Sequence, residues 1–343
     1  MSSSSTTANV PSASGGLLSQ LAAARALIAE GRADAAVEAA RETALLYPGI
    51  AVAALALGEA LLAARYLPTA IAEFQRALRL DPAMDEARYA IGCAWLEAGE
   101  PDKAFDALAP LDSERIPGLE EKLARSTAMR AQPRSDAGYV RHLFDQFSAD
   151  YDTRMLGQLC YGAPRILREL ALLVIQPPRK LVVLDLGCGT GLSGAAFGDM
   201  TSRLDGVDLS PRMIEKARER GIYDSFAVAD IETALANITN QYDLILAADT
   251  LVYLGDLEKI VAGAARALKS DGHFLFTTEK KDGETFELGP KRRWRHSESY
   301  LREQAAHAGM EISGLLECVP RTEAGQPVAG FAVALAKPGG IAK

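Results

Sequence analysis

The sequence contains no hydrophobic run long enough to span a bilayer. A membrane-crossing helix needs about 20 consecutive apolar residues, whereas the longest runs, such as residues 51–57, are short and rich in alanine. Basic residues are also few, since 37 Lys and Arg stand against 45 Asp and Glu, a formal net charge of −8. Because binding to duplex nucleic acid needs a basic face, we expect neither a membrane nor duplex nucleic acid as a partner.

Cysteine is scarce, and the amino terminus carries no targeting signal. The four cysteines, Cys93, Cys160, Cys188 and Cys318, show no metal-ligand spacing, so we expect no metal site and free thiols in a reducing compartment. Residues 1–16 are rich in Ser, Thr and Ala and contain neither basic residues nor an apolar core. This composition fits neither a secretory signal nor a transit peptide. We therefore expect a disordered tail on a cytoplasmic protein.

The first third of the chain repeats with a period of 34 residues. Gly58 and Gly92 are one period apart, as are Pro48 and Pro82. A small residue lets two antiparallel helices approach closely, and a proline ends the second helix. The pattern resembles the tetratricopeptide repeat. We expect three units over residues 17–118, at about 17–50, 51–84 and 85–118, followed by a helical linker over residues 119–138.

Two roles are open for such a short array of repeats. Its concave face would bind a protein partner, or the array would serve self-association or docking onto the rest of the chain. Three units offer little concave surface, and nothing in the sequence decides between these roles.

The remaining residues alternate strand-like and helix-like segments, which is typical of a parallel sheet covered by helices. Residues 320–327 are too few to hold a crossover helix between the last two expected strands, so these strands should pair antiparallel. The expected strands are 181–184, 204–208, 226–229, 242–247, 273–278, 311–319 and 328–336, with helices from 192, from 211, over 257–268 and over 297–308.

A glycine-rich turn follows the first expected strand. Gly187, Gly189 and Gly191 would let a ligand lie against the backbone, next to the amino terminus of a helix. A dinucleotide site would need its last glycine at position 192, which is Leu192. Asp208 ends the second expected strand, where a carboxylate can accept hydrogen bonds from both hydroxyls of a ribose.

The spacing of these glycines resembles the first motif of class I S-adenosylmethionine-dependent methyltransferases. The segment from Val207 to Met213, the pair Asp230-Ile231 and the strand over 242–247 resemble the later motifs. The resemblance covers residues 139–338 and, with the repeats in front, extends to predicted bacterial methyltransferases that carry tetratricopeptide repeats. It implies an α/β fold, a Rossmann-like seven-stranded methyltransferase sheet with its last strand antiparallel, and S-adenosylmethionine as cofactor. The cofactor-binding residues that it implies are Asp185, Gly187, Cys188, Gly189, Gly191, Asp208, Leu209, Met213, Asp230, Ile231 and Ala247.

Substrate groups should lie beyond the carboxyl ends of the fourth and fifth strands. The catalytic candidates are His296, Asp249, Tyr253 and Tyr300, with Thr250 and Glu279 as further pocket residues. We rank His296 first as a base or substrate ligand; the alternative is that it caps a helix or is simply exposed. A base is needed only if the acceptor starts protonated.

Two further segments should border the pocket. Lys291, Arg292, Arg293 and Arg295 surround Trp294 in an expected loop, which would grip an acidic substrate or would simply be solvated. Residues 139–161 are rich in aromatic side chains and should form a helical lid over the cofactor.

The sequence thus predicts methyl transfer to a small-molecule or protein-bound acceptor, with the repeats as a docking or self-association module. The alternative is an adaptor in which the repeats bind a partner and the cofactor-binding domain is not catalytic. A nicotinamide-dependent oxidoreductase is disfavoured by Leu192 and by the antiparallel last strand pair.

Overall fold

The computed structural model describes residues 13–148, 150–176, 179–289 and 292–339, and it divides the chain into two compact units, residues 1–131 and 132–343. Most of the tail expected over residues 1–16 lies outside the described residues. Of the linker expected over residues 119–138, the first part is a helix that belongs to the first unit. Leu119 of this helix packs in a buried cluster with Leu96 and Leu108, so the segment is part of a core.

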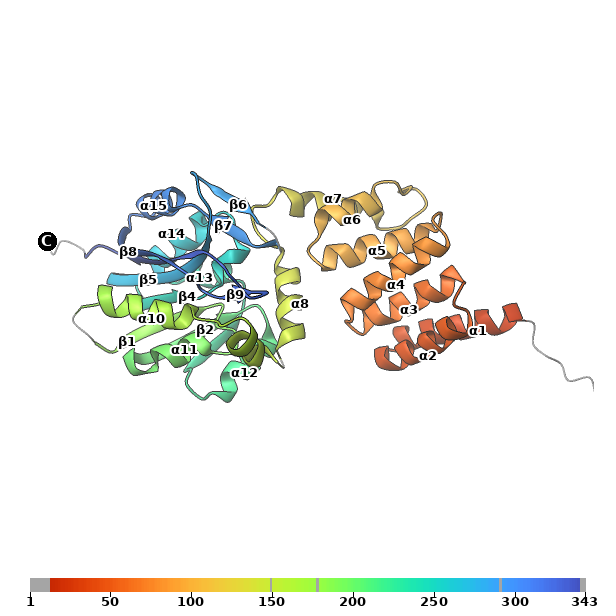
Figure 1. Ribbon diagram of the computed structural model, residues 1–343, viewed down its shortest axis with the longest axis horizontal. Helices are drawn as coiled ribbons and strands as arrows, with labels where there is room; N and C mark the ends of the chain where they lie inside the picture. Colours follow the sequence, from red (N-terminus) through yellow and green to blue (C-terminus); the bar gives the residue numbers. More distant parts are fainter. Residues whose placement is uncertain (1–12, 149, 177–178, 290–291, 340–343) are drawn as a thin grey trace, which may run out of the picture. The chain divides into compact units, whose positions relative to one another are not determined.

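The described part of the first unit is helical, and its helices follow one another as packed pairs (Figure 1). Three of the helices begin 34 residues apart, at Ala33, Leu67 and Pro101, which matches the period in the sequence. The helices are α1 (Ala13–Ala29), α2 (Ala33–Leu46), α3 (Ala51–Ala63), α4 (Leu67–Leu80), α5 (Asp85–Glu97), α6 (Pro101–Leu108) and α7 (Leu119–Ala131).

The repeated glycines lie where two helices of a pair approach most closely. A Cβ atom on Gly58 would lie 2.5 Å from the ring of Phe74, and one on Gly92 would lie 2.5 Å from Leu108. Real Cβ atoms do not approach other atoms so closely, and both neighbours are fully buried. The close approach predicted from the sequence is confirmed at both positions.

We expect the substitution Gly58→Ala to lower the free energy of unfolding of the first unit by about 1–3 kcal/mol, because the added methyl group overpacks against Phe74. Urea denaturation of the full chain, followed by circular dichroism, measures this loss. Gly49→Ala is the matched control, since a Cβ atom there meets no heavy atom within 4 Å. Equal midpoints for the two variants would contradict the packing account.

The second unit is built on a mixed sheet with the order β3-β2-β1-β4-β5-β11-β8. The first five strands run parallel, and β11 is antiparallel to both of its neighbours, as the short connection predicts. The strands are β1 (Leu181–Leu186), β2 (Thr201–Asp208), β3 (Ser225–Val228), β4 (Tyr242–Ala247), β5 (Leu268–Lys280), β8 (Glu311–Cys318) and β11 (Gly330–Ala336).

Helices cover both faces of this sheet (Figure 1). Because successive side chains of a strand point to opposite faces, Val183 packs in a core with α10, whereas Leu184 packs in a core with α14. The helical segments are α8 (Ala137–Phe147), α9 (Tyr151–Thr153), η1 (Arg154–Gln158), α10 (Ala163–Val174), α11 (Leu192–Phe197), η2 (Gly198–Met200), α12 (Pro211–Glu219), α13 (Ile231–Leu235), η3 (Leu251–Tyr253), α14 (Glu258–Ala267) and α15 (Glu298–His307).

Two small hairpins add to this framework. β7 (Trp294–His296) pairs with the end of β5 and with β6 (Phe286–Leu288), so part of the basic segment that we expected as a loop is a strand. Lys291 lies outside the described residues. The second hairpin, β9 (Thr322–Glu323) with β10 (Gln326–Pro327), fills the connection between β8 and β11.

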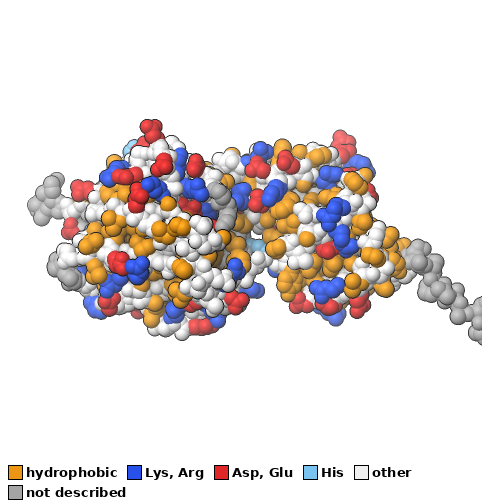
Figure 2. All heavy atoms as spheres, viewed as in Figure 1, with side chains coloured by type: hydrophobic (Ala, Val, Ile, Leu, Met, Phe, Trp, Pro, Cys, Tyr) orange, Lys and Arg blue, Asp and Glu red, His pale blue; other side chains and the backbone are white. Residues whose placement is uncertain are grey.

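The surface carries charges of both signs. On the face drawn in Figure 2, acidic and basic side chains are interspersed over both units, and that face of the described residues shows no continuous basic stripe. No helix in the described ranges combines the length and the apolar character that crossing a bilayer requires.

Candidate active site

A cavity of about 670 Å³ lies beyond the carboxyl ends of the parallel strands. This volume includes solvent at the open side of the cavity. Its lining comes from the segments that follow four strands and from the segment that begins the second unit. After the strands lie Gly187, Gly189, Asp208, Leu209, Asp230, Ile231, Ala248, Asp249, Thr250, Tyr253 and Leu254, and the first segment contributes Arg134, Ser135, Ala137, Val140, Phe144 and Tyr151.

The glycine turn brings bare backbone to this cavity. Gly187 and Gly189 have φ angles of 68° and 53°, which L side chains rarely adopt. A Cβ atom on Gly189 would meet no heavy atom within 4 Å, whereas one on Gly187 would lie 2.4 Å from Oγ1 of Thr250. The turn therefore leaves open space above Gly189 for a ligand, with Thr250 filling the place beside Gly187.

Gly191 is needed for another reason. Its φ is 89°, and a Cβ atom there would lie 3.0 Å from Arg220 and from Tyr223. The third glycine therefore allows close packing against protein side chains and does not line the cavity.

Four other implied cofactor residues also lie outside the cavity lining. Asp185 accepts a hydrogen bond of 2.6 Å from the hydroxyl of Tyr223, and burial raises its pKa to about 7. Cys188, Met213 and Ala247 are buried in the core around the turn and the strand ends. These four residues are buried and do not line the cavity.

Asp208 presents a buried carboxylate to the cavity. Its Oδ2 accepts a hydrogen bond of 2.9 Å from the amide of Gly189, and its Oδ1 accepts one of 2.8 Å from the amide of Ser210. Burial raises the pKa of Asp208 to about 6 despite these bonds. A carboxylate has about four acceptor positions, so two remain for ligand hydroxyls.

The carboxylate of Asp230 is more fully occupied than the sequence suggested. Its Oδ1 accepts a hydrogen bond of 3.0 Å from the amide of Glu232, and its Oδ2 pairs with Arg134. Arg134 also bonds Glu232 at 2.8 Å, which ties the start of the second unit to the end of β3. Arg134 was not predicted as a site residue, because it falls in the expected linker.

The expected lid is helical and is fastened to the turn and to β2. Asp145 accepts a hydrogen bond of 2.5 Å from the hydroxyl of Ser210. Asp152 accepts a hydrogen bond of 2.5 Å from Thr190 and pairs with Arg220. These bonds hold α8 and α9 over the cavity, where Val140, Phe144 and Tyr151 line it.

Two phenol groups, those of Tyr151 and Tyr253, line the cavity beside Asp249. Within the described chain, no hydrogen bond is formed by the hydroxyl of Tyr151 or Tyr253. Burial, followed by the charge of Asp249, raises the pKa of Tyr151 far above its ordinary value, so this phenol stays protonated. Both hydroxyls are therefore available to a ligand.

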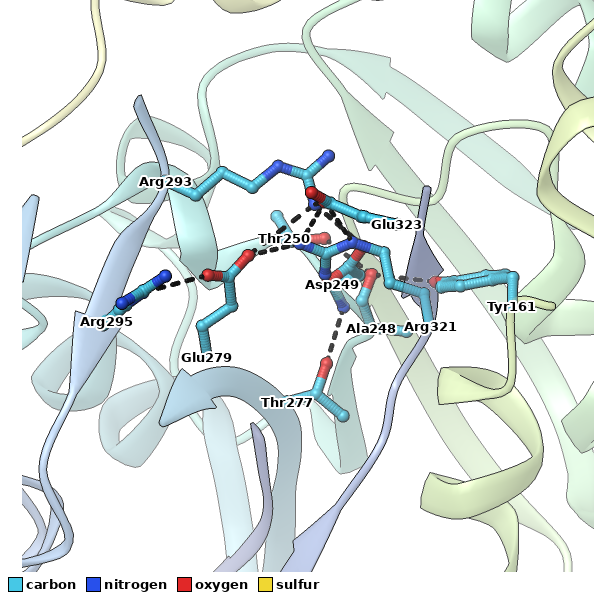
Figure 3. A network of polar contacts seen from close by, with 10 residues as sticks. All are labelled: Tyr161, Ala248, Asp249, Thr250, Thr277, Glu279, Arg293, Arg295, Arg321 and Glu323. Atoms are coloured by element: carbon cyan, nitrogen blue, oxygen red, sulfur yellow. Dashed lines mark hydrogen bonds and ion pairs between the residues drawn. The ribbon is translucent and has the colours of Figure 1, made fainter. Parts of the chain in front are cut away.

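Asp249 belongs to a network of three arginines and three carboxylates (Figure 3). Arg321 has no exposed surface, and it pairs with Asp249 and Glu279 while its Nε lies 3.1 Å from Glu323. Nη1 of Arg293 lies 3.2 Å from Glu323, and Nε of Arg295 lies 3.5 Å from Glu279. Arg293 and Arg295 of the basic segment are thus paired with carboxylates, and Arg295 lies in β7 and not in a solvated loop.

His296 and Tyr300 lie in the core outside the cavity lining. Nε2 of His296 lies 3.0 Å from the carbonyl oxygen of Gly255, and its ring stacks on Tyr300 at 5.8 Å. The hydroxyl of Tyr300 accepts from the amide of Leu257 at 2.8 Å and donates to Asp256. His296 is fully buried, and Ser297 caps α15, so both alternatives for His296 are also corrected.

We expect His296 to couple folding to pH. Burial lowers its pKa to about 4 from an ordinary 6.5, so between these values the unfolded chain binds a proton that the folded chain does not. His296 therefore lowers the free energy of unfolding as the pH falls from 6.5 toward 4, by about 3 kcal/mol in total. Urea denaturation at neutral and mildly acidic pH should show a smaller acid loss for His296→Gln; equal losses would contradict the assignment.

Part of the second unit resembles known proteins in sequence and in fold. Residues 184–276 match the family model described as "Methyltransferase domain". The match identifies this part of the second unit as a methyltransferase domain, and the cofactor of the class that the sequence resembles is S-adenosylmethionine.

Two curated relatives each share 32% identity with part of the chain. They are malonyl-[acyl-carrier protein] O-methyltransferase of Acetivibrio thermocellus, over 32% of this chain and 39% of that protein, and human methyltransferase-like protein 27, over 37% of this chain and 52% of that protein. The chain thus spans at most about half the length of these relatives. Among solved structures, the [4+2]-cyclase SpnF aligns with a TM-score of 0.51 at 17% identity, covering 61% of this chain and 99% of that one, which shows a shared fold.

Proposed function

We propose that this chain transfers the methyl group of S-adenosylmethionine to a small-molecule or protein-bound acceptor. The observation that carries the proposal is the arrangement of the cavity. A side-chain-free turn at Gly187 and Gly189 borders the same cavity as the buried carboxylate of Asp208, which accepts a hydrogen bond from the amide of Gly189. The match of residues 184–276 to a methyltransferase domain supports the same chemistry.

The residues present fit this cofactor. Asp208 would hold both ribose hydroxyls with its two remaining acceptor positions, and the open space above Gly189 would admit the ligand against the backbone. Leu209 and Ile231 would flank the adenine, and Asp230 would accept from its amino group beside Arg134. When bound, the cofactor supplies a methyl group on a positively charged sulfur.

The protein's own contribution is positioning and exclusion of water. Phe144 packs edge to face against Tyr151 and Tyr253, with ring centroids 6.1 and 5.7 Å apart, and closes the cavity under α8. Tyr151 and Tyr253 would orient the acceptor through their free hydroxyls. Asp249 is paired with Arg321, so it is a poor base, and an acceptor that is already ionised suits the site best.

The names of relatives favour oxygen as the accepting atom. The curated relatives include malonyl-[acyl-carrier protein] O-methyltransferase and ubiquinone biosynthesis O-methyltransferase of Xanthomonas oryzae pv. oryzae. The first of these names contains a carrier protein, which fits a protein-bound acceptor. We propose that the helix pairs of the first unit are tetratricopeptide repeats that dock such a partner or a second copy of the chain.

Calorimetric titration of the full chain with S-adenosylmethionine tests the proposal. We expect saturable binding at one site per chain and no binding of NADH. Incubation with methyl-labelled cofactor and a cell extract should then label an acceptor. Cofactor binding without any methyl transfer would favour the adaptor alternative, and absence of binding at millimolar ligand would remove the proposal.

A further inference from the structure

The carboxylate of Glu323 occupies a site formed by two arginines. Its Oε1 lies 3.1 Å from Nε and 3.1 Å from Nη2 of Arg321, and 3.2 Å from Nη1 of Arg293 (Figure 3). Nε of Arg321 donates a hydrogen bond to this oxygen, and the other two guanidinium nitrogens form ion pairs with it. Such fork-like groups are the usual means of binding carboxylates.

Glu323 is the least fixed of the three acids in the network. Asp249 follows β4 and Glu279 belongs to β5, and their side chains are only 10% and 7% exposed. Glu323 is 19% exposed and stands on a hairpin whose two strands have two residues each. Glu323 is thus the most exposed of the three acids and stands on the shortest strand pair, whereas Glu279 belongs to a long central strand.

Glu323 also fits its site incompletely. Nη1 of Arg293 is buried and, within the described residues, forms no hydrogen bond. Its nearest carboxylate oxygens lie 3.2 Å away on Glu323, 3.8 Å on Glu279 and 3.9 Å on Asp249. A buried donor without an acceptor costs free energy, so a carboxylate that also bonds Nη1 of Arg293 would recover free energy that Glu323 leaves unused.

The surroundings provide charge and room for an organic acid. Without Glu323, Arg293, Arg295 and Arg321 would face only Asp249 and Glu279, which leaves an excess of one positive charge. Glu279, Arg295 and Glu323 line a second, open depression with residues 326–329. On its other side the network borders the main cavity through Asp249.

We propose that Glu323 holds the place of a carboxylate of the methyl acceptor, and that Arg293 and Arg321 anchor an organic acid. The acid displaces Glu323, enters from the second depression and reaches toward the main cavity past Asp249. This inference rests on the proposed function and names its substrate class. Arg293 and Arg321 would thus select acceptors that carry a carboxylate. The atom that receives the methyl group would belong to another part of the acceptor.

Chemical rescue of a vacated site tests the inference. In the full-length Glu323→Ala variant, sodium acetate should raise the melting temperature relative to sodium chloride at equal ionic strength, because acetate replaces the missing carboxylate. The wild-type chain should show a smaller rise in acetate, because acetate must first displace Glu323. Glu317→Ala should behave as the wild type does, since Glu317 is 69% exposed and pairs with Lys280 at the surface. Equal melting of Glu323→Ala in acetate and chloride would overturn the inference.

A second pair of ligands tests whether the site takes an organic acid. 3-Phenylpropionate should raise the melting temperature of Glu323→Ala more than acetate does, and its primary amide should have no effect; equal effects of acid and amide would overturn the inference. If the alanine variant does not fold, the melting temperatures with acid and amide can be compared in Glu323→Gln, which keeps the size of the side chain.

Cofactor titration of the same proteins separates the two proposals. Glu323 does not line the main cavity, so Glu323→Ala should bind S-adenosylmethionine as the wild-type chain does. Absence of an acetate effect together with intact cofactor binding would remove only this inference. Absence of cofactor binding by the wild-type chain would remove the proposed function.

Discussion

Replacement of Asp208 by alanine should abolish measurable cofactor binding or weaken it by roughly 100-fold or more. The carboxylate would lose two charge-assisted hydrogen bonds to the ribose, each worth about 1.5–3 kcal/mol. The variant would also leave the amides of Gly189 and Ser210 without their acceptor, which loosens the turn under the ligand. Isothermal calorimetry with S-adenosylmethionine measures the change.

The matched control is Asp199→Ala. This aspartate is 70% exposed, pairs with Arg168 and does not line the cavity, so its loss should leave the dissociation constant within about twofold. Wild-type affinity in Asp208→Ala would refute the ribose contact.

The affinity of the wild-type chain should also depend on pH. Because the pKa of Asp208 is raised to about 6, its ionised form, which accepts the hydroxyls, is lost as the pH falls through that value.

Replacement of Arg321 by methionine should strongly destabilise the second unit. The guanidinium is completely buried and neutralises Asp249, Glu279 and Glu323. Without it these carboxylates face one another with only Arg293 and Arg295 nearby. Breaking a buried ionic network by removing one partner costs about 3–5 kcal/mol, and each kcal/mol lowers the melting temperature of a unit of this size by about 2–4 °C.

Scanning calorimetry of the full chain measures this loss. Arg321→Lys should lie between the wild type and Arg321→Met, because one ammonium group cannot bond three carboxylates at once. Arg165→Met is the control, since Arg165 is 70% exposed and pairs with Glu169 one helical turn away; its effect should stay below about 1 kcal/mol. A stable Arg321→Met variant would show that the network contributes little.

The sheet was predictable because its strands carry their own signal. The strands expected over 242–247 and 311–319 correspond to β4 and β8 almost residue for residue, and an acid ends β2 or follows β4 where each leaves the core. The number of residues between the last two strands was enough to predict their antiparallel pairing. These features are local, so a single sequence contains them.

The ionic network was not predictable, because its members are far apart in the sequence. Its members come from the ends of β4, β5, β7 and β9, and Arg321 stands in a short connection with no distinctive neighbours. Lys, Arg and their acidic partners are usually solvated, so the basic segment was interpreted as a loop. Only the pairing of β7 with β5 brings Arg295 beside Glu279.

The position of His296 could not be predicted either, because it depends on the direction of a side chain. Its place near the carboxyl edge of the sheet made it the first candidate for a base, and a sequence cannot show which way a ring points. The ring packs with Phe286 and Tyr300, and its Nε2 is engaged by Gly255, so the phenols of Tyr151 and Tyr253 take its place beside the cavity.

A crystal structure of the chain with S-adenosylhomocysteine bound is the most direct test of the account. We expect the adenosine to lie against the backbone of Gly187 and Gly189, with both ribose hydroxyls within hydrogen-bond distance of the Asp208 carboxylate. A ligand placed elsewhere, or this cavity filled by the protein's own side chains while the ligand binds, would contradict the assignment of the site.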